Sequence, residues 1–352
     1  MENELEAYFT DYEDLEVHEV MLKDRHRQEA YFNAIMSNKH LFEGKVILDV
    51  GAGTGILSMF AAKAGAKLVY AVEASNLAKI AIEIIEDNNL TSIVKVIHSK
   101  IENFQLPKNE DKVDIIISEW MGFYLLHEGM LDSVIFARDH FLKSNGYIFP
   151  QYATIYVAPC SVSSRYSYWD NVDGINMRIF GKRLRTQKSN KPEIINIDES
   201  EMLSKEIVMS WFDLKNITTN DLDEIQYEGV IPFEKAGLHQ GFCIWFDCQF
   251  PSKNFESGVI LSTSPYEKSQ THWKQCVIVL PETECNKIEI KEPVAFKILM
   301  KRKSDDNRKY DLEIELLDVN DVEHPLPCEC YLTKCILAKA HLESMNVDQD
   351  DD

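Results

Sequence analysis

Two glutamates in the middle of the chain have the spacing and surroundings of a cation receptor. Glu119 ends an apolar run that begins at Asp114, and Glu128 follows nine residues later with no Lys or Arg between them. Two carboxylates on one short apolar loop repel each other unless a cation lies between them. A guanidinium suits paired carboxylates best, because its planar fork donates several hydrogen bonds. The loop therefore predicts a site for an arginine side chain, although N-capping or solvation would also accommodate such a pair.

A glycine-rich turn predicts a cofactor that contains a nucleoside. The strand that contains Asp49 runs into Gly51-Ala-Gly53-Thr-Gly55, where the glycines let the backbone approach a ligand. Glu73 ends the next strand about twenty residues later, where a carboxylate can bind the ribose hydroxyls. The spacing G-x-G-x-G differs from the dinucleotide pattern, and Asp49 suits a ligand ammonium better than a pyrophosphate. S-adenosylmethionine is therefore favoured over a nicotinamide cofactor, and with it a transferase over an oxidoreductase.

With these motifs in place, the chain resembles the protein arginine methyltransferases, and the asymmetric-dimethylating (type I) branch most closely. The resemblance covers almost the whole chain. It is carried by Tyr8-Phe9-x-x-Tyr12, the segment His18 to Asp24, the glycine loop, the double-glutamate loop and Thr271-His272-Trp273. It implies S-adenosylmethionine as methyl donor, S-adenosylhomocysteine as product, and monomethyl and asymmetric dimethylarginine in proteins as the reaction's outcome.

The resemblance also implies roles for individual residues. The catalytic residues would be Glu119, Glu128, His272 and Asp24. His272 would pair with Asp24 across the domain boundary, either as a proton shuttle or as a structural link. The cofactor would be bound by His18 and Arg27 at its methionine portion, Glu73 at the ribose, Glu102 at the adenine, and by Asp49, Gly51 and Gly53. The substrate arginine would lie among Tyr12, Met21, Met130 and Trp273.

Two segments depart from the family's commonest pattern. His127 and Gly129 flank Glu128, at two positions where the family frequently has tyrosine and serine. These replacements would affect the rigidity of the loop and the preference for substrates. Residues 171–193 occupy the place of the family's dimerisation arm and are unusually basic. We hypothesise that this basic stretch docks on the acidic face of a second protomer, because the chain as a whole is acidic.

The order of elements predicts two domains behind an N-terminal helical cover. Residues 1–43 have helical patterning and would cover the cofactor. In residues 44–150 apolar strands alternate with helices, which predicts an α/β, Rossmann-like methyltransferase domain with a parallel, doubly wound sheet. In residues 151–352 short apolar strands separated by turn residues predict a mostly antiparallel sandwich or barrel, interrupted by the arm at 171–193.

The composition of the chain limits the classes of partner that it is expected to bind. The net charge of −21 disfavours direct binding to nucleic acid, which requires a basic face, and favours arginine-rich proteins such as histone tails or glycine–arginine segments of RNA-binding proteins. No apolar run approaches the roughly 20 residues of a membrane helix, and no secretory signal is visible, so a cytoplasmic or nuclear protein is expected. The resemblance implies a homodimer. Cys328-x-Cys330-x4-Cys335 lacks paired C-x2-C spacing, so reduced thiols and no metal are expected.

Two other functions share parts of this pattern. A methyltransferase of a small guanidino compound would keep the glycine loop and Glu73 but would not require the long β-domain. A non-catalytic scaffold for arginine-rich tails would keep an acidic surface, but it would not require both glutamates of the loop together with Glu73.

Overall fold

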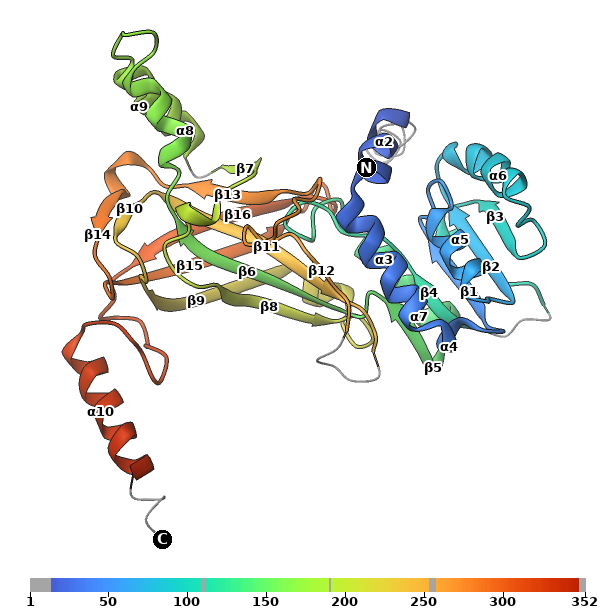
Figure 1. Cartoon of the computed structure of the whole chain (residues 1–352). Coiled ribbons are helices and arrows are strands. Elements are labelled where there is room, and N and C mark those ends of the chain that lie inside the picture. The colour runs from blue at the N-terminus through green and yellow to red at the C-terminus, as the bar shows by residue number, and fades with distance from the viewer. Residues whose placement is uncertain (1–13, 109–111, 190, 253–257, 348–352) are drawn as a thin grey trace.

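A computed structural model describes residues 14–108, 112–189, 191–252 and 258–347 (Figure 1). An α/β domain and a β-domain lie side by side, and two helical projections extend from the β-domain. The segment that carries Tyr8, Phe9 and Tyr12 lies outside the described residues.

Three N-terminal helices lead into the α/β domain: α2 (Leu15–Lys23), α3 (Arg25–Ser37) and α4 (Lys39–Phe42). Asp14 caps α2, and Asp24 ends α2 and caps α3 by accepting a hydrogen bond from the Arg27 N–H at 3.0 Å. Such caps satisfy backbone donors that have no partner within the helix. The helical pattern predicted for this region is confirmed from residue 15 onward.

The α/β domain is a five-stranded, fully parallel sheet, as predicted. Its strands are β1 (Val46–Val50), β2 (Leu68–Glu73), β3 (Val94–His98), β4 (Val113–Ile117) and β5 (Leu142–Phe149), in the order β3-β2-β1-β4-β5. Its helices are α5 (Ile56–Lys63), α6 (Leu77–Asp87) and α7 (Leu131–Phe141). The order reverses between β1 and β4, so right-handed crossovers place α5 and α6 on one face and α7 on the other. Ligands of such sheets bind at this reversal, beyond the carboxyl ends of the strands.

The β-domain is antiparallel throughout its described strands. They are β6 (Tyr152–Cys160), β7 (Pro192–Ile195), β8 (Ile207–Asp213), β9 (Glu224–Pro232), β10 (Gly237–His239), β11 (Gly241–Gln249), β12 (Ile260–Ser262), β13 (Gln275–Val279), β14 (Asn286–Ile288), β15 (Pro293–Arg302) and β16 (Tyr310–Leu317). One sheet has the order β7-β13-β11-β6-β8 with β12 on β11, a second is β16-β15-β9, and a third is β10-β14. Buried side chains of both domains form one continuous core, which fixes the domains against each other.

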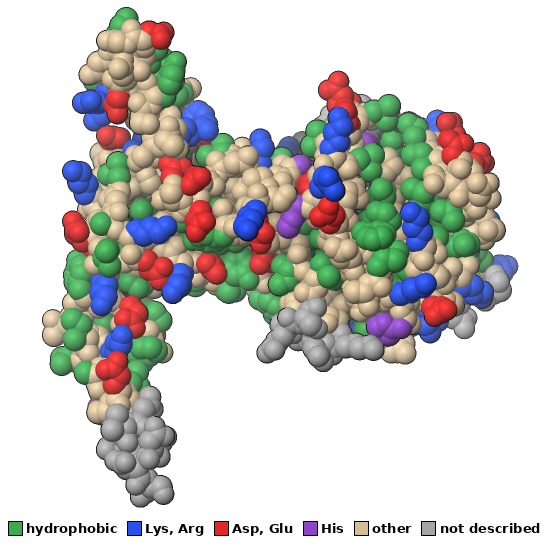
Figure 2. All heavy atoms as spheres, in the orientation of Figure 1, with side chains coloured by type: hydrophobic (Ala, Val, Ile, Leu, Met, Phe, Trp, Pro, Cys, Tyr) green, Lys and Arg blue, Asp and Glu red, His purple; other side chains and the backbone are tan. Residues whose placement is uncertain are grey.

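The arm consists of α8 (Ser163–Ser167) and α9 (Arg178–Lys188), which project from one end of the β-domain (Figure 1). It begins earlier than the predicted residue 171. Figure 2 shows hydrophobic side chains along it, and the exposed ones are Tyr168, Ile175, Met177, Ile179 and Phe180.

Three basic residues of the arm form ion pairs within the same protomer. Lys182 and Arg185 pair with Glu282, and Lys188 pairs with Glu193. Docking of this stretch on the acidic face of a second protomer stays a prediction. The arm also offers exposed apolar side chains.

The C-terminal helix α10 (Thr333–Val347) projects from the β-domain away from the arm (Figure 1). Beside its first turn, His324 lies together with Cys328, Cys330 and Cys335, a grouping that the cysteine spacing did not indicate. Among the described residues, none of the helices combines the length and apolar character needed to span a bilayer.

Candidate active site

A cavity of about 620 Å³ lies at the carboxyl end of the parallel sheet and is closed on one side by the β-domain. Its volume is within the range of ligand sites. The predicted residues that line it are His18, Met21, Arg27, Gly51, Gly53, Glu73, Glu102, Glu119, Glu128, Met130, His272 and Trp273. Asp24 and Asp49 do not line it, and Tyr12 lies outside the described residues.

The glycine loop and Glu73 form one wall of this cavity. Gly51 and Gly53 have φ of 70° and 55°, in the left-handed region that favours glycine. A Cβ on Gly51 would lie 2.2 Å from the Met130 methyl, so the two residues are in close contact. Glu73 accepts hydrogen bonds from the N–H groups of Gly53 and Ser75, both at 2.8 Å. The carboxylate is therefore fixed at the edge of the cavity, where a ligand hydroxyl can reach it.

Asp49 does not line the cavity, and its contact with the cofactor stays a prediction. Its side chain is fully buried and accepts a hydrogen bond from Ser58 Oγ at 2.7 Å. Burial raises the pKa of Asp49 to about 7. The residue therefore links β1 to the helix α5 that follows the glycine turn.

Glu102 lies in a short 3-10 helix (Ile101–Asn103) at the far end of the cavity. Its carboxylate accepts a hydrogen bond from Ser133 Oγ at 2.7 Å. It is thus placed on the same cavity as Glu73, as the predicted contact with the adenine requires.

The double-glutamate loop owes its shape to backbone conformations that few residues tolerate. Tyr124, Leu125, Glu128 and Gly129 all have positive φ. A Cβ on Gly129 would lie 3.0 Å from backbone atoms of the hairpin between β15 and β16, and its φ is 60°, so glycine is favoured there. His127 is hydrogen-bonded to the Tyr124 hydroxyl at 2.8 Å, and burial lowers its pKa. The unusual neighbours of Glu128 are therefore part of a packed loop.

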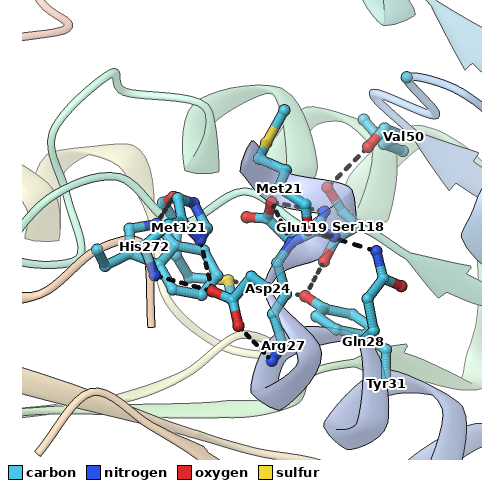
Figure 3. Close-up of polar contacts among 12 residues, drawn as sticks. Met21, Asp24, Arg27, Gln28, Tyr31, Val50, Ser118, Glu119, Met121 and His272 are labelled. Atoms are coloured by element: carbon cyan, nitrogen blue, oxygen red, sulfur yellow. Dashed lines mark hydrogen bonds and ion pairs between the residues drawn. The ribbon is translucent and has the colours of Figure 1, made fainter. Parts of the chain in front are cut away.

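Glu119 forms an ion pair with Arg27 that the sequence did not reveal (Figure 3). The guanidinium donates from Nε and Nη2 to Glu119 Oε2 at 3.0 and 2.9 Å. Only 8% and 9% of the two side chains are exposed, so loss of either partner would leave a buried charge unpaired. The chain thus supplies one cation at the carboxylate pair itself.

His272 and Asp24 form the expected contact between the β-domain and the N-terminal helices (Figure 3). His272 donates from its backbone N–H and from Nδ1 to Asp24 Oδ2, at 2.9 and 2.7 Å. Burial opposes ionisation of Asp24, but the hydrogen bonds from His272 and from the Arg27 N–H outweigh it and lower its pKa. The predicted pairing is confirmed, and its catalytic role stays a prediction.

Trp273 is both a cavity residue and a core residue. It is buried and lines the cavity, and its Nε1 donates to the Met121 carbonyl at 2.8 Å. Its ring lies against that of His272, with the centroids 4.0 Å apart. The residue therefore connects the β-domain to the backbone of the double-glutamate loop.

Sequence reasoning missed Arg308, which lies between β15 and β16 and lines the same cavity. Its Nη1 donates to the Glu128 carbonyl at 2.7 Å, and its own carbonyl accepts the Glu128 N–H at 2.7 Å. The segment around it is a charged turn, and nothing in that pattern signals a contact with a residue 180 positions away. Tyr31 was also missed; its hydroxyl donates to the Ser118 carbonyl at 2.9 Å and holds the end of β4.

Comparisons with known proteins agree with this architecture. Residues 151–320 match the model of the arginine methyltransferase oligomerization subdomain, and residues 32–127 match that of the ribosomal protein L11 methyltransferase (PrmA). The chain is 40% identical over 312 residues to a probable protein arginine N-methyltransferase 6.1 of Oryza sativa subsp. indica, covering 81% of this chain and 80% of that protein. It is 41% identical to protein arginine N-methyltransferase 6 of Danio rerio, covering 78% and 79% of the two chains.

Solved structures give the same result. A Trypanosoma brucei PRMT1 enzyme–prozyme heterotetrameric complex with AdoHcy has a TM-score of 0.75 at 33% identity, covering 89% of this chain and 97% of that chain. A structure of PRMT6 with SAH has a TM-score of 0.75 at 30% identity, covering 86% and 100%. The glycine loop, the paired glutamates, His272 and Trp273 line one cavity of this chain. Together with that arrangement, these matches show that the chain belongs to the protein arginine N-methyltransferase family.

Proposed function

We propose that this chain transfers methyl groups from S-adenosylmethionine to the ω-nitrogens of arginine in proteins, giving monomethyl and asymmetric dimethylarginine. The observation that carries the proposal is that Glu119 and Glu128 line the same cavity as Gly51 and Glu73. One cavity can therefore hold a guanidinium beside a nucleoside cofactor. The similarity to structures with AdoHcy and SAH supports the choice of cofactor.

The residues of the cavity fit S-adenosylmethionine. The close backbone of the glycine loop leaves room for the ligand, Glu73 would hold the ribose, Glu102 the adenine, and His18 and Arg27 the methionine portion. When bound, the cofactor supplies an electrophilic sulfonium methyl. The chain's contribution is to hold the arginine nitrogen in line with it, and positioning of this kind is worth up to roughly 7–11 kcal/mol.

Arginine is a poor nucleophile because its side chain has a pKa above about 12 and stays protonated. The paired glutamates can offset this. Both hydrogen bonds from Arg27 reach Glu119 Oε2, so Oε1 can accept from a substrate guanidinium. Glu119 and Glu128 together draw positive charge toward the nitrogens that they contact, which leaves the attacking nitrogen richer in electrons. Bond formation makes that nitrogen acidic, and His272, oriented by Asp24, would carry the released proton away.

Met21 and Met130 would set the product. Both line the cavity, and the Met130 methyl lies against Gly51. Methionine is slim and adaptable, so these two walls would leave room for a second methyl on an already methylated nitrogen. Fragment mass spectrometry should detect asymmetric dimethylarginine, and products that carry only the symmetric isomer would refute this part of the proposal.

The substitutions Glu119→Gln and Glu128→Gln test the proposal with labelled cofactor and a glycine–arginine-rich peptide. Each variant should lose methyl transfer by orders of magnitude, because the amide cannot balance a guanidinium charge. Glu128→Gln should keep cofactor affinity, whereas Glu119→Gln also removes the ion-pair partner of Arg27. Glu86→Gln on the exposed surface of α6 is the control. Wild-type turnover by either loop variant would contradict the assignment. Peptide binding without transfer by the unmodified protein would favour a scaffold, and label on free guanidino compounds alone would favour a small-molecule enzyme.

The acidic chain, with a net charge of −21, suits arginine-rich substrates such as histone tails or RNA-binding proteins in the cytoplasm or nucleus. We also infer a homodimer formed through the arm, because the matched subdomain is one of oligomerization and Ile179 and Phe180 are exposed. Ile179→Asp should give monomers in light scattering, whereas the control Gln187→Asp on the same helix should not. A dimer that survives Ile179→Asp would refute this interface.

A further inference from the structure

Four metal-binding side chains meet next to the C-terminal helix, far from the cavity of the active site. The ligand atoms of His324, Cys328, Cys330 and Cys335 all lie within 4.8 Å of one another. The three cysteines are buried and His324 is half-buried. The cysteines are free thiols and form no disulfide. The missing C-x2-C spacing argued against a metal, but the fourth ligand comes from a histidine that the linear pattern did not connect to the cysteines.

The distances match the coordination shell of one zinc ion. With Zn–S bonds of about 2.3 Å and Zn–N bonds of about 2.0–2.1 Å, a tetrahedral site places nitrogen and sulfur roughly 3.5 Å apart. His324 Nδ1 lies 3.5 Å from Cys328 Sγ, 3.5 Å from Cys330 Sγ and 3.2 Å from Cys335 Sγ. One nitrogen in contact with three sulfurs is the arrangement that a Cys3His site requires, and it is not a usual feature of apolar packing.

The histidine is oriented for metal binding by its second nitrogen. Nε2 lies 2.8 Å from the Val319 carbonyl, which can only accept a hydrogen bond, so Nε2 carries the proton. In the neutral ring the lone pair is then on Nδ1, directed at the three sulfurs. Metal-bound histidines are typically fixed in this way by a carbonyl or carboxylate on the opposite nitrogen.

Apolar packing contributes little to holding the surrounding segment in place. The three cysteines, with Leu332 packed against them, form a small cluster separate from the main core. The helix that follows leaves Ile336, Leu337 and Met345 largely exposed, so its apolar side chains do not anchor it. A metal that binds the folded segment adds its binding free energy to folding, which such a small unit needs.

We propose that His324, Cys328, Cys330 and Cys335 form a structural Zn²⁺ site that anchors α10 to the β-domain. Thiolate and imidazole ligands in a tetrahedral set favour zinc among the common metals. Four protein ligands leave no position for water or substrate, so the site is structural. Binding displaces the three thiol protons and leaves the histidine neutral. The site lies beyond residues 151–320, the part of the chain that matches the oligomerization subdomain.

Metal analysis of the full-length protein, purified without chelators, tests this proposal. We expect one zinc ion per chain by plasma mass spectrometry, with much reduced content in Cys328→Ser and Cys335→Ser. Cys285→Ser is the matched control, because Cys285 is a half-buried thiol of the β-domain outside the cluster. It should retain the full zinc content.

Cobalt substitution provides a second measurement that does not depend on the variants folding. Co²⁺ in the unmodified protein should show thiolate-to-metal charge transfer and the intense visible bands of a tetrahedral site. Cofactor binding reports whether each variant is folded at the distant cavity. Zinc far below one equivalent after incubation with the metal, a cobalt spectrum without thiolate bands, or equal metal loss in Cys285→Ser would overturn the proposal.

Discussion

Replacing Arg308 by alanine should disable the double-glutamate loop without touching its carboxylates. The variant removes a charged hydrogen bond of 2.7 Å to the Glu128 carbonyl. It keeps the backbone carbonyl at position 308, which accepts the Glu128 N–H. The experiment therefore isolates the guanidinium that holds one side of the loop.

The magnitude follows from what this contact restrains. A hydrogen bond from a charged donor contributes about 1.5–3 kcal/mol. Glu128 has a φ of 78°, a conformation that costs on the order of 1–3 kcal/mol in a non-glycine residue and persists only when its surroundings enforce it. If about 2 kcal/mol of this restraint is lost from the transition state, kcat/KM falls roughly thirtyfold.

Steady-state kinetics with a glycine–arginine-rich peptide and calorimetry with the cofactor measure the two halves of the site separately. We expect kcat/KM for the peptide to fall and cofactor affinity to stay close to wild type, because Gly53 and Ser75, not Arg308, hold Glu73. Lys303→Ala is the control, since it removes a positive charge from the same hairpin and leaves the contact with Glu128 intact. Arg308→Ala with the same kcat/KM as this control would refute the reasoning, and so would a parallel loss of cofactor affinity.

Three further predictions concern other parts of the site. Gly51→Ala should weaken cofactor binding about tenfold in calorimetry. Its φ of 70° costs alanine roughly 1–2 kcal/mol, and the new Cβ would collide with Met130. Unchanged cofactor affinity would contradict this prediction. His272→Gln should shift the pH–rate profile if the ring moves the proton; a lower melting temperature with an unchanged profile would assign the contact with Asp24 a structural role only. Burial raises the pKa of Asp49 to about 7, whereas an unfolded chain has about 4, so the folded state holds the extra proton and loses stability as pH rises through this window. Asp49→Asn should therefore lose less thermal stability than wild type between about pH 5 and about pH 8, and an equal loss would show that Asp49 does not titrate there.

The central strands of the α/β domain, β1, β2 and β4, could be predicted because most of their residues are apolar and buried. The edge strand β5 was not predicted, because its first half carries Lys143, Ser144 and Asn145. All five residues of β1 are buried, and its neighbours β2 and β4 have the same character. β8 and β9 were harder to find. β8 exposes Val208 and Trp211, and β9 alternates with exposed charged residues such as Glu224 and Glu228, so neither is a clear apolar run.

The candidate site could be predicted where its residues lie in local motifs, and not where a contact joins distant segments. Glu119, Glu128 and Glu73 follow strands or loops that can be recognised in the sequence. The ion pair of Arg27 with Glu119 spans 92 positions, and composition alone cannot assign such a partner. The same reason hid the cluster around His324, whose role depends on three-dimensional closeness to the cysteines.

The connections between the domains explain how the double-glutamate loop keeps its shape with unusual residues beside Glu128. Trp273 and Arg308, both from the β-domain, donate to backbone carbonyls of the loop, those of Met121 and Glu128. A carbonyl is present whatever side chain a position carries, so these contacts do not depend on residues 127 and 129. Variation at those positions can therefore leave these two contacts in place. The β-domain is therefore a structural requirement for placing both glutamates, in addition to any surface it offers to the substrate.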